Sequence, residues 1–479
     1  MTPSRRRLVS ALVLVCALVA AACGQKAGVH VASGGGGTGS GGGFEAGGGD
    51  LGGGDLGGVT GDPSVDGAGG GSTGGSTSGG STSGGSTSGG STSGGSRGGT
   101  SGGGGSSGGS GSSGQQASGP AWGDTVVIGI HAPITGAAPL PSSFAAAASV
   151  YADWINAKGG IHGRKIRVEV ANDEYQPATA VQRCRELVQQ KNAFLLIGGG
   201  GTDQIQACAR FAESAGVPYL SAGVTEIGLR GLKGYFAVSM SYKQQGAYLA
   251  NYVKKTWPDK ADTPAMVYSD TPNFQDAVEG YKAAMPNVKL YKLSRVPSST
   301  ELANTARELC VDQREVAYPL MAPKDWLTLV GSQPCTLQWA GVGLTMGLDT
   351  VANTGCRSSG EKINGSVFFS PFPGIDKAAG IDPDFAEATK GKNPDDIFAA
   401  LFAVNKAVGE LLKRTGPQLS RAAFVSTASN AKNIATGLNP VLNYSPNDHF
   451  GADAVHVLKA VCDGNQSGKY QTIGTFAKF

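Results

Sequence analysis

The chain has 479 residues, which is too many for one ordinary domain, and 78 of them are glycine. The formal net charge is only +3 and charges of both signs are mixed, so the composition does not support nucleic acid or an anionic membrane surface as a partner. Eight cysteines are many for a cytosolic enzyme and are typical of an exported protein with disulfides.

The first residues have the pattern of an export signal. Arg5, Arg6 and Arg7 form a basic patch, an apolar run follows, and alanines precede Cys23. The run is too short for a comfortable membrane span, so a secretory signal over residues 1–22 is favoured over a transmembrane anchor. The segment ALVAAAC resembles a bacterial lipoprotein signal, and this resemblance implies that Cys23 becomes a lipid-carrying N-terminus. Cleavage and secretion without a lipid is the alternative.

Residues 23–118 are predicted to form a linker. Most of this stretch consists of Gly, Ser and Thr, including tandem GGSTS units. Without recurring apolar side chains, no core could offset the entropy lost by ordering the backbone. We expect a flexible tether between the lipid anchor and a folded body, with a neutral low-complexity expansion as the alternative.

The first part of the folded body alternates strands and helices. Short apolar or alternating runs predict strands within residues 125–136, 165–173, 193–201 and 217–223. Between them, helices are predicted over residues 144–160, 178–191 and 203–216. Such an alternation predicts βαβ units and a parallel sheet.

The same rhythm begins again after about residue 241. It predicts helices over residues 248–257 and 274–285 and strands over residues 264–270 and 288–294. The alternation continues through residues 300–312, 316–322, 324–331 and 336–343. Two consecutive series contain too many strands for one short sheet and therefore predict two similar lobes. Because open parallel sheets bind ligands at the carboxyl ends of their strands, a cleft between the lobes is expected.

The stretch from TVVIGIHAPITG through WINAKGGIHGRKIRVEVANDEYQPATAVQRCRELV to FLLIGGGG and VPYLSAGVTE resembles type I periplasmic binding proteins. Within them it is most similar to the leucine-binding receptors of branched-chain amino acid ABC importers. The turn INAKGGIHGRKI and the acidic pair after it are the most specific part. The resemblance implies an α/β Venus-flytrap fold with two lobes, each a parallel sheet flanked by helices, joined by crossover hinge segments.

The resemblance also implies how the chain is divided. Lobe 1 would comprise residues 124–240 plus 370–439, and lobe 2 would comprise residues 241–369 plus 440–479. The crossovers are expected near Met240, near residues 368–371 and near residues 440–444.

In such receptors, loops of lobe 1 hold the ligand carboxylate through N–H groups and hydroxyls. In the loop after the third predicted strand, the glycines at residues 199–201 allow a ligand to approach the backbone closely. A helix that begins near Thr202 would direct its free N–H groups at an anion. The alternative is a tight turn with Asp203 as N-cap. A glycine stands where amino acid receptors have a serine hydroxyl, which weakens the case for an amino acid carboxylate. The candidates in lobe 1 are Thr135, Gly200, Gly201, Thr202, Val224 and Thr225.

In lobe 2 the candidate ligand contacts are Phe274, Tyr318 and Met321. We find no carboxylate where the ammonium of an amino acid would need one, since Asp325 is expected in the first turn of a helix. Asp270 could reach the cleft or cap a helix. A buried ammonium without a partner costs several kcal/mol. The sequence therefore favours a neutral or anionic ligand with apolar or aromatic parts over a simple zwitterion.

Six cysteines remain for the folded body, and six allow fifteen pairings. Cys184 and Cys208 lie on consecutive predicted helices that flank one strand, so they form the first predicted pair. Neither CxxC spacing nor a Cys/His cluster is present, so no metal and no cofactor are expected. His131 follows the first strand and is a ligand contact or a structural residue. The pairs Cys310 with Cys335 and Cys356 with Cys462 are proposed within lobe 2.

These observations predict a solute-binding lipoprotein on the outer face of the cell membrane. It would capture a small molecule, either amino-acid-like or a neutral or anionic apolar compound, and deliver it to the permease and ATPase of an ABC importer. An enzyme is disfavoured, because no GxSxG elbow is present and GGGGTDQ lacks the Lys-Ser/Thr end of a P-loop. The alternatives are a ligand sensor without import and an envelope structural or adhesive protein.

Overall fold

The computed structural model describes residues 122–136, 140–343 and 345–479. The predicted export signal, the lipidation site at Cys23 and the linker lie outside these residues. Of the helices that the described residues form, none has the length and apolarity to span a bilayer.

The first sheet has five parallel strands in the order β2-β1-β3-β4-β5. All six residues of β3 are buried, and so are seven of the eight in β1. Helices cover both faces of such a sheet, which explains why these strands appear in the sequence as continuous apolar runs. The strands are β1 (Thr125–Ala132), β2 (Lys165–Asn172), β3 (Ala193–Gly198), β4 (Tyr219–Ser221) and β5 (Tyr235–Ala237).

The second sheet has seven strands in the order β12-β11-β10-β9-β8-β6-β7. Five are parallel, but β11 and β12 form an antiparallel hairpin that extends the sheet beside β10. The parallel part of this sheet was predicted from the sequence, and the antiparallel hairpin at its edge was not. The strands are β6 (Pro264–Ser269), β7 (Lys289–Leu293), β8 (Val316–Leu320), β9 (Gln338–Val342), β10 (Val367–Ser370), β11 (Val455–Asp463) and β12 (Ser467–Ala477).

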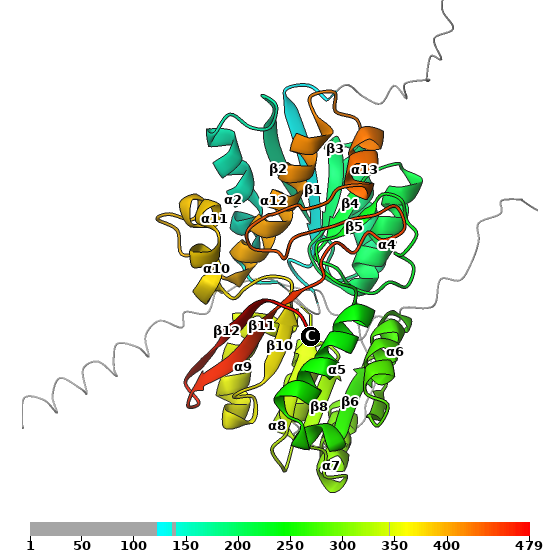
Figure 1. Ribbon diagram of the computed structural model, residues 1–479, viewed down its shortest axis with the longest axis vertical. Helices are drawn as coiled ribbons and strands as arrows, with labels where there is room; N and C mark the ends of the chain where they lie inside the picture. Colours follow the sequence, from blue (N-terminus) through cyan, green and yellow to red (C-terminus); the bar gives the residue numbers. More distant parts are fainter. Residues whose placement is uncertain (1–121, 137–139, 344) are drawn as a thin grey trace, which may run out of the picture. The chain divides into compact units, whose positions relative to one another are not determined.

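Helices alternate with the strands and lie over the two sheets (Figure 1). Short 3-10 turns are η1 (Asp259–Asp262), η2 (Pro272–Phe274), η3 (Thr345–Gly347) and η4 (Gly360–Lys362). The helices are α2 (Phe144–Ala157), α3 (Pro177–Gln189), α4 (Thr202–Ser214), α5 (Tyr242–Thr256), α6 (Gln275–Ala284), α7 (Ser299–Val311), α8 (Pro323–Gly331), α9 (Asp349–Ser359), α10 (Ile375–Ile381), α11 (Pro383–Ala388), α12 (Asp396–Thr415) and α13 (Arg421–Ser429).

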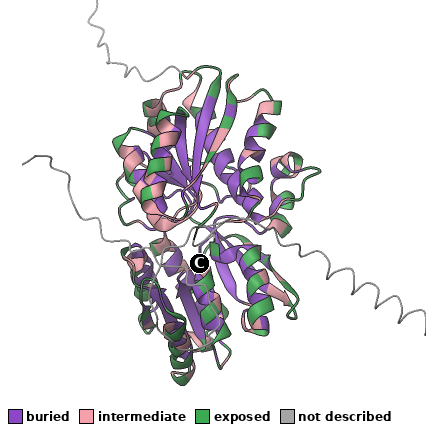
Figure 2. Cartoon of the chain, turned by 180° about the vertical axis from the view of Figure 1, so that it is seen from behind, coloured by how far each residue is buried: buried purple, intermediate pink, exposed green. Residues whose placement is uncertain are grey.

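The chain returns to the first sheet after β10. Helix α12 packs against α2, and Arg421 at the start of α13 donates to the carbonyl oxygens of Ala193 and Phe194 in β3. We call the first sheet with α2–α4 and α10–α13 lobe 1, and the second sheet with α5–α9 lobe 2. The predicted two-lobed α/β fold is confirmed, and the central strands of both sheets are almost wholly buried (Figure 2).

The lobe boundaries remain a prediction, and one detail of the structure suggests how to refine them. The segment before β11 pairs with β5 of lobe 1, because the N–H of Ala237 donates to His449 O at 2.8 Å and the N–H of Gly451 donates to Ala237 O at 3.0 Å. We therefore propose that the third crossover lies at residues 452–454 rather than near residues 440–444.

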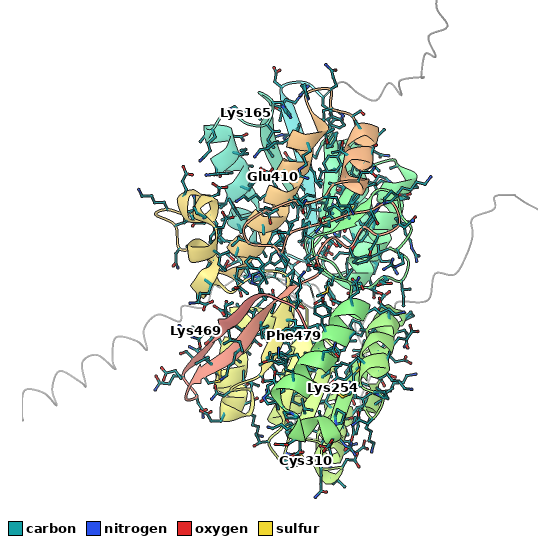
Figure 3. All side chains as sticks on the ribbon, in the orientation of Figure 1. Lys165, Lys254, Cys310, Glu410, Lys469 and Phe479 are labelled. Carbon is teal, nitrogen blue, oxygen red and sulfur yellow. A yellow bond between two sulfur atoms is a disulfide. The ribbon has the colours of Figure 1, made fainter. Side chains whose placement is uncertain are left out.

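Disulfides join the six cysteines of the described residues in the three predicted pairs. Cys184–Cys208 connects α3 to α4, with 6.2 Å between the Cα atoms. Cys310 lies at the end of lobe 2 that is far from lobe 1 (Figure 3). Cys184–Cys208 thus lies within lobe 1, and the other two disulfides lie within lobe 2. The other pairs are Cys310–Cys335, with 5.8 Å between Cα atoms, and Cys356–Cys462, with 5.5 Å.

Candidate functional site

A cavity of about 290 Å³ lies where the carboxyl ends of the strands of both lobes meet. Lobe 1 contributes the loops that follow β1, β2, β3 and β4, and lobe 2 contributes the segments that follow β8 and β9. The position agrees with the expectation for open parallel sheets, whose ligands bind outside the strand ends. The wall also includes Ile397 of α12 and Tyr242, the first residue of α5.

The glycine loop after β3 brings backbone to the wall. Gly201 has φ of +77°, a backbone conformation in which a side chain is strained, and a Cβ atom there would displace the amide of Gln204, whose Oε1 would lie 2.1 Å away. Gly201 is the N-cap of α4, and no side chain caps this helix end within the described residues. The first N–H groups of α4 thus lack a side-chain acceptor, and a helix N-terminus favours an anionic group.

Asp203 does not cap α4, contrary to the alternative drawn from the sequence. Its carboxylate binds the guanidinium of Arg295, with 2.8 Å between Oδ2 and a terminal nitrogen, and also contacts the side-chain amide of Asn273. Both partners belong to lobe 2, so Asp203 links the lobes at the edge of the cavity.

Tyr175 is held over the glycine loop by its backbone. Glu174 and Tyr175 both have positive φ, at +56° and +60°. The N–H of Tyr175 donates to Asp173 Oδ1 at 2.9 Å, and the side-chain amide of Gln204 donates to the Tyr175 carbonyl at 2.5 Å. Two consecutive non-glycine residues in this region are costly, and such conformations cluster at functional sites. Burial raises the pKa of Tyr175, and the charges of Asp203, Asp173 and Asp325 raise it further.

Tyr242 is the second tyrosine of the cavity wall and begins α5, next to the predicted crossover near Met240. Its hydroxyl lies 3.9 Å from the position that a Cβ atom of Gly343, after β9, would occupy. Burial raises the pKa of Tyr242 to about 12, although a hydrogen bond with Thr202 opposes the shift and the charge of Asp276 adds to it. Tyr242 therefore stands between the glycine loop of lobe 1 and the β9 loop of lobe 2.

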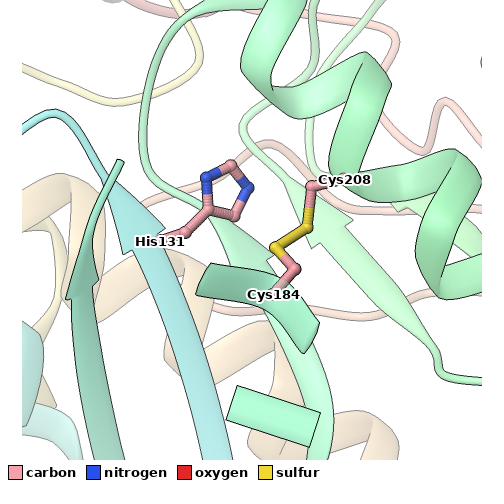
Figure 4. A group of neighbouring side chains, drawn as sticks. All are labelled: His131, Cys184 and Cys208. Atoms are coloured by element: carbon pink, nitrogen blue, oxygen red, sulfur yellow. A yellow bond between two sulfur atoms is a disulfide. The ribbon is translucent and has the colours of Figure 1, made fainter. Parts of the chain in front are cut away.

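His131 supports the wall from behind. Its ring is fully buried, with Nδ1 at 2.8 Å from Asp173 Oδ2 and Nε2 at 2.7 Å from the hydroxyl of Tyr219. His131 also lies beside Cys184 and Cys208 (Figure 4). These cysteines are bonded to each other and both imidazole nitrogens have partners, so the group does not offer a metal site. His131 takes the structural role of the two that the sequence left open.

The lobe 1 candidates fall into two groups. Gly200, Gly201, Thr202 and Val224 line the cavity. The other two do not. Thr135 is exposed, and its hydroxyl accepts from Asn172 Nδ2 at 2.8 Å. Thr225 is fully buried, and its hydroxyl donates to Asp276 Oδ2 at 3.0 Å.

The lobe 2 candidates all lie outside the wall. Tyr318 is fully buried in β8, and its ring packs 5.1 Å from that of Tyr281. Met321 is buried in the core, and Phe274 is partly buried near Tyr242. The segment after β8 still forms part of the wall, but through the next residues, Ala322–Lys324, where α8 begins.

Sequence reasoning missed several wall residues. Tyr175 follows the acidic pair after β2, and Lys324 follows the end of β8, so strand-end position was a usable signal for both. No local signal identifies the apolar residues, because they come from separate loops and helices. These are Leu140, Ile205, Leu348, Val351 and Ile397.

Comparisons with known proteins point to one family. The family model described as periplasmic binding protein matches residues 125–466. A Leu/Ile/Val-binding protein homolog from Brucella melitensis is 23% identical over 344 residues, which cover 70% of this chain and 91% of the relative. An amino acid binding protein from Pseudomonas aeruginosa is 34% identical over 131 residues, which span only 35% of that relative and 27% of this chain.

Solved structures share the fold. A valine-bound branched-chain amino acid transporter component from Thermus thermophilus has a TM-score of 0.59 at 16% identity, covering 74% of this chain and 97% of that one. A fatty acid ABC transporter substrate-binding protein from Thermomonospora curvata has a TM-score of 0.61 at 18% identity, covering 74% and 93%. At these identities the likeness concerns the fold alone.

Proposed function

Because the chain belongs to the type I periplasmic binding proteins of the branched-chain amino acid receptor family, we propose that it captures a small molecule between its lobes and delivers it to an ABC importer. The observation that carries the proposal is the cavity at the strand ends, whose wall is built by both lobes. Members of the family are extracytoplasmic binding proteins and not enzymes.

The proposed mechanism is closure about the crossovers. A ligand that contacts Thr202 in lobe 1 and Lys324 in lobe 2 gains contacts only when the lobes are together. Such a ligand biases an open–closed equilibrium by its differential affinity for the closed state. The permease and ATPase complex would then recognise the closed form.

We also propose that Cys23 carries a lipid and that residues 23–118 tether the body to the outer face of the membrane. The support is the sequence pattern alone. Cells that express the protein and are fed a labelled fatty acid should incorporate label into the wild-type chain and not into Cys23→Ala, which should be released into the medium. Label retained in Cys23→Ala would refute lipidation at this residue.

The ligand is proposed to be amino-acid-like or a neutral or anionic apolar compound. A thermal-shift screen of the exported chain against amino acids, aromatic acids, fatty acids, amides and sugars tests solute capture, because a ligand that binds only the native state raises the melting temperature. Uptake of the hit by cells with and without the gene then separates import from sensing. Equal uptake by both strains would favour a sensor.

A further inference from the structure

Lys324 is the only residue with a formal charge in the described part of the cavity wall. The gaps at residues 137–139 and 344 contain only Ala, Pro and Leu. The ammonium of Lys324 lies 2.7 Å from Asp325 Oδ1, and its side chain is 63% exposed. Since an ammonium has three N–H donors, the contact with Asp325 leaves donors for a ligand oxygen.

The carboxylates around the wall tyrosines already have partners. Asp203 binds Arg295 of lobe 2, and Asp173 binds the ring of His131 at 2.8 Å. Asp325 binds Lys324. The described wall itself contains no carboxylate. An ammonium group on a ligand would therefore lose its water without gaining a charged partner, which is strongly unfavourable.

Asp276 is the main alternative candidate for a carboxylate that would pair with a ligand ammonium. Its Oδ2 accepts from the hydroxyl of Thr225 at 3.0 Å and from the N–H of Glu226 at 2.6 Å. Its Oδ1 has no hydrogen-bond partner among the described residues. However, this oxygen is buried and Asp276 does not belong to the wall, so a ligand in the cavity does not reach it.

The rest of the wall is largely apolar and comes from both lobes. Ile205 and Ile397 of lobe 1 and Leu348 and Val351 of lobe 2 are at least nine-tenths buried in the core, yet each contributes to the wall. Leu140 adds a partly buried side chain beside the glycine loop. Such a wall favours an aliphatic or aromatic group, because burying it removes apolar surface from water.

We infer that the ligand is an apolar carboxylate without an ammonium group and that Lys324 recognises its charge. The inference rests on the proposed function, since it names the ligand class of the same cavity. It also assigns to Lys324 the discrimination between a carboxylate and its neutral amide.

The test removes one charged group at a time from two amino acids. For leucine the series is L-leucine, 4-methylpentanoate, 4-methylpentanamide and isopentylamine; for phenylalanine it is L-phenylalanine, 3-phenylpropanoate, 3-phenylpropanamide and 2-phenylethylamine. Calorimetric titration of the exported chain measures each affinity at neutral pH. In at least one series, the ammonium-free acid should bind about tenfold or more tightly than the parent amino acid, and the amine should not bind.

Variants at one position test the role of Lys324. Lys324→Gln should lower the affinity for the acid about tenfold and change the affinity for the amide by no more than about twofold. Lys324→Arg should keep the affinity for the acid. Lys243→Gln is the matched control, because Lys243 is an exposed lysine that is paired with Glu279 at 3.4 Å and does not line the cavity. Circular dichroism and the melting temperature establish that each variant is folded.

Several outcomes would overturn the inference. Tighter binding of either amino acid than of its acid, with that preference lost in Asp276→Asn, would make Asp276 the ammonium partner. Equal affinities for acid and amide, unchanged by Lys324→Gln, would remove the role of Lys324. If no acid binds but another compound of the wider screen does, the ligand class is wrong and solute capture stands. If no compound of the wider screen binds, both the proposed ligand class and the proposed solute capture are rejected.

Discussion

The backbone N–H of Asp349 donates a 2.6 Å hydrogen bond to the carboxylate of Asp396. Asp349 begins α9 of lobe 2 and Asp396 begins α12 of lobe 1, so this bond joins the lobes beside the cavity wall. Burial raises the pKa of Asp396 to about 7; the bond from Asp349 opposes the shift, and the charges of Asp349 and Asp395 add to it.

Replacing Asp396 by Asn should stabilise the protein in a pH-dependent way. The folded-state pKa, about 7, lies above the ordinary value of 3.8, so the stabilisation from proton binding is complete below about pH 4 and is lost as the pH rises through 7. Asp396→Asn removes this loss and should raise the melting temperature at pH 8 by roughly 3–6 °C, with little change at pH 4. Asp463→Asn, at the exposed end of β11, is the control. An equal gain at both pH values would contradict the assignment.

Close packing of α5 on α6 depends on glycine. A Cβ atom on Gly280 would lie 2.1 Å from the carbonyl oxygen of Lys243, a backbone atom that cannot move aside cheaply. Gly280→Ala should therefore lower the free energy of unfolding by about 1–3 kcal/mol in a urea titration. Gly380→Ala is a matched helical control with nothing within 4 Å, and it should be neutral or stabilising by up to about 1 kcal/mol. Equal effects at both sites would show that the contact with the Lys243 carbonyl does not limit stability.

Two disulfides that enclose chain segments of nearly equal length should differ in their effect on binding. Cys184–Cys208 and Cys310–Cys335 span 24 and 25 residues, so removing either pair as a double Cys→Ala variant should cost a similar stability, about 2–4 kcal/mol. The first pair includes Cys208 of α4, whose N-terminus forms the wall, whereas the second pair lies at the end of lobe 2 that is far from lobe 1. We expect weaker binding of the screening hit in the Cys184/Cys208 variant and unchanged binding in the other. Loss of binding in both variants would argue for a general loss of structure.

Gln204 should control affinity through the position of Tyr175. Because its side-chain amide donates to the Tyr175 carbonyl, Gln204→Ala frees a loop held at positive φ and should weaken binding of the screening hit about three- to tenfold. Gln206→Ala provides the control, since Gln206 lies on the same helix but donates to Ile227 O. Glu174→Gly, which favours the same backbone conformation, should leave affinity unchanged and not reduce stability. An unaltered affinity in Gln204→Ala would refute this positioning role.

The sequence predicted the parts of the site that are local in the chain. The glycine loop follows a fully apolar strand and precedes an amphipathic helix, and both signals lie within one short stretch around Gly200. Tyr318 was misplaced for a physical reason: all five residues of β8 are buried, so the strand shows no alternation that tells which side chain faces which layer. Ile397 could not be predicted as part of the wall, because it reaches the wall through the packing of α12 on α2, which is distant in the sequence.

The order in which the chain is made has a consequence for when the protein can bind. The wall needs the glycine loop near residue 200 and also Ile397, and between them the chain builds every parallel strand of lobe 2. A chain that emerges from its N-terminus first therefore cannot complete the cavity until α12 has been synthesised. Ligand binding at this cavity therefore cannot contribute to the stability of the protein before that point in synthesis.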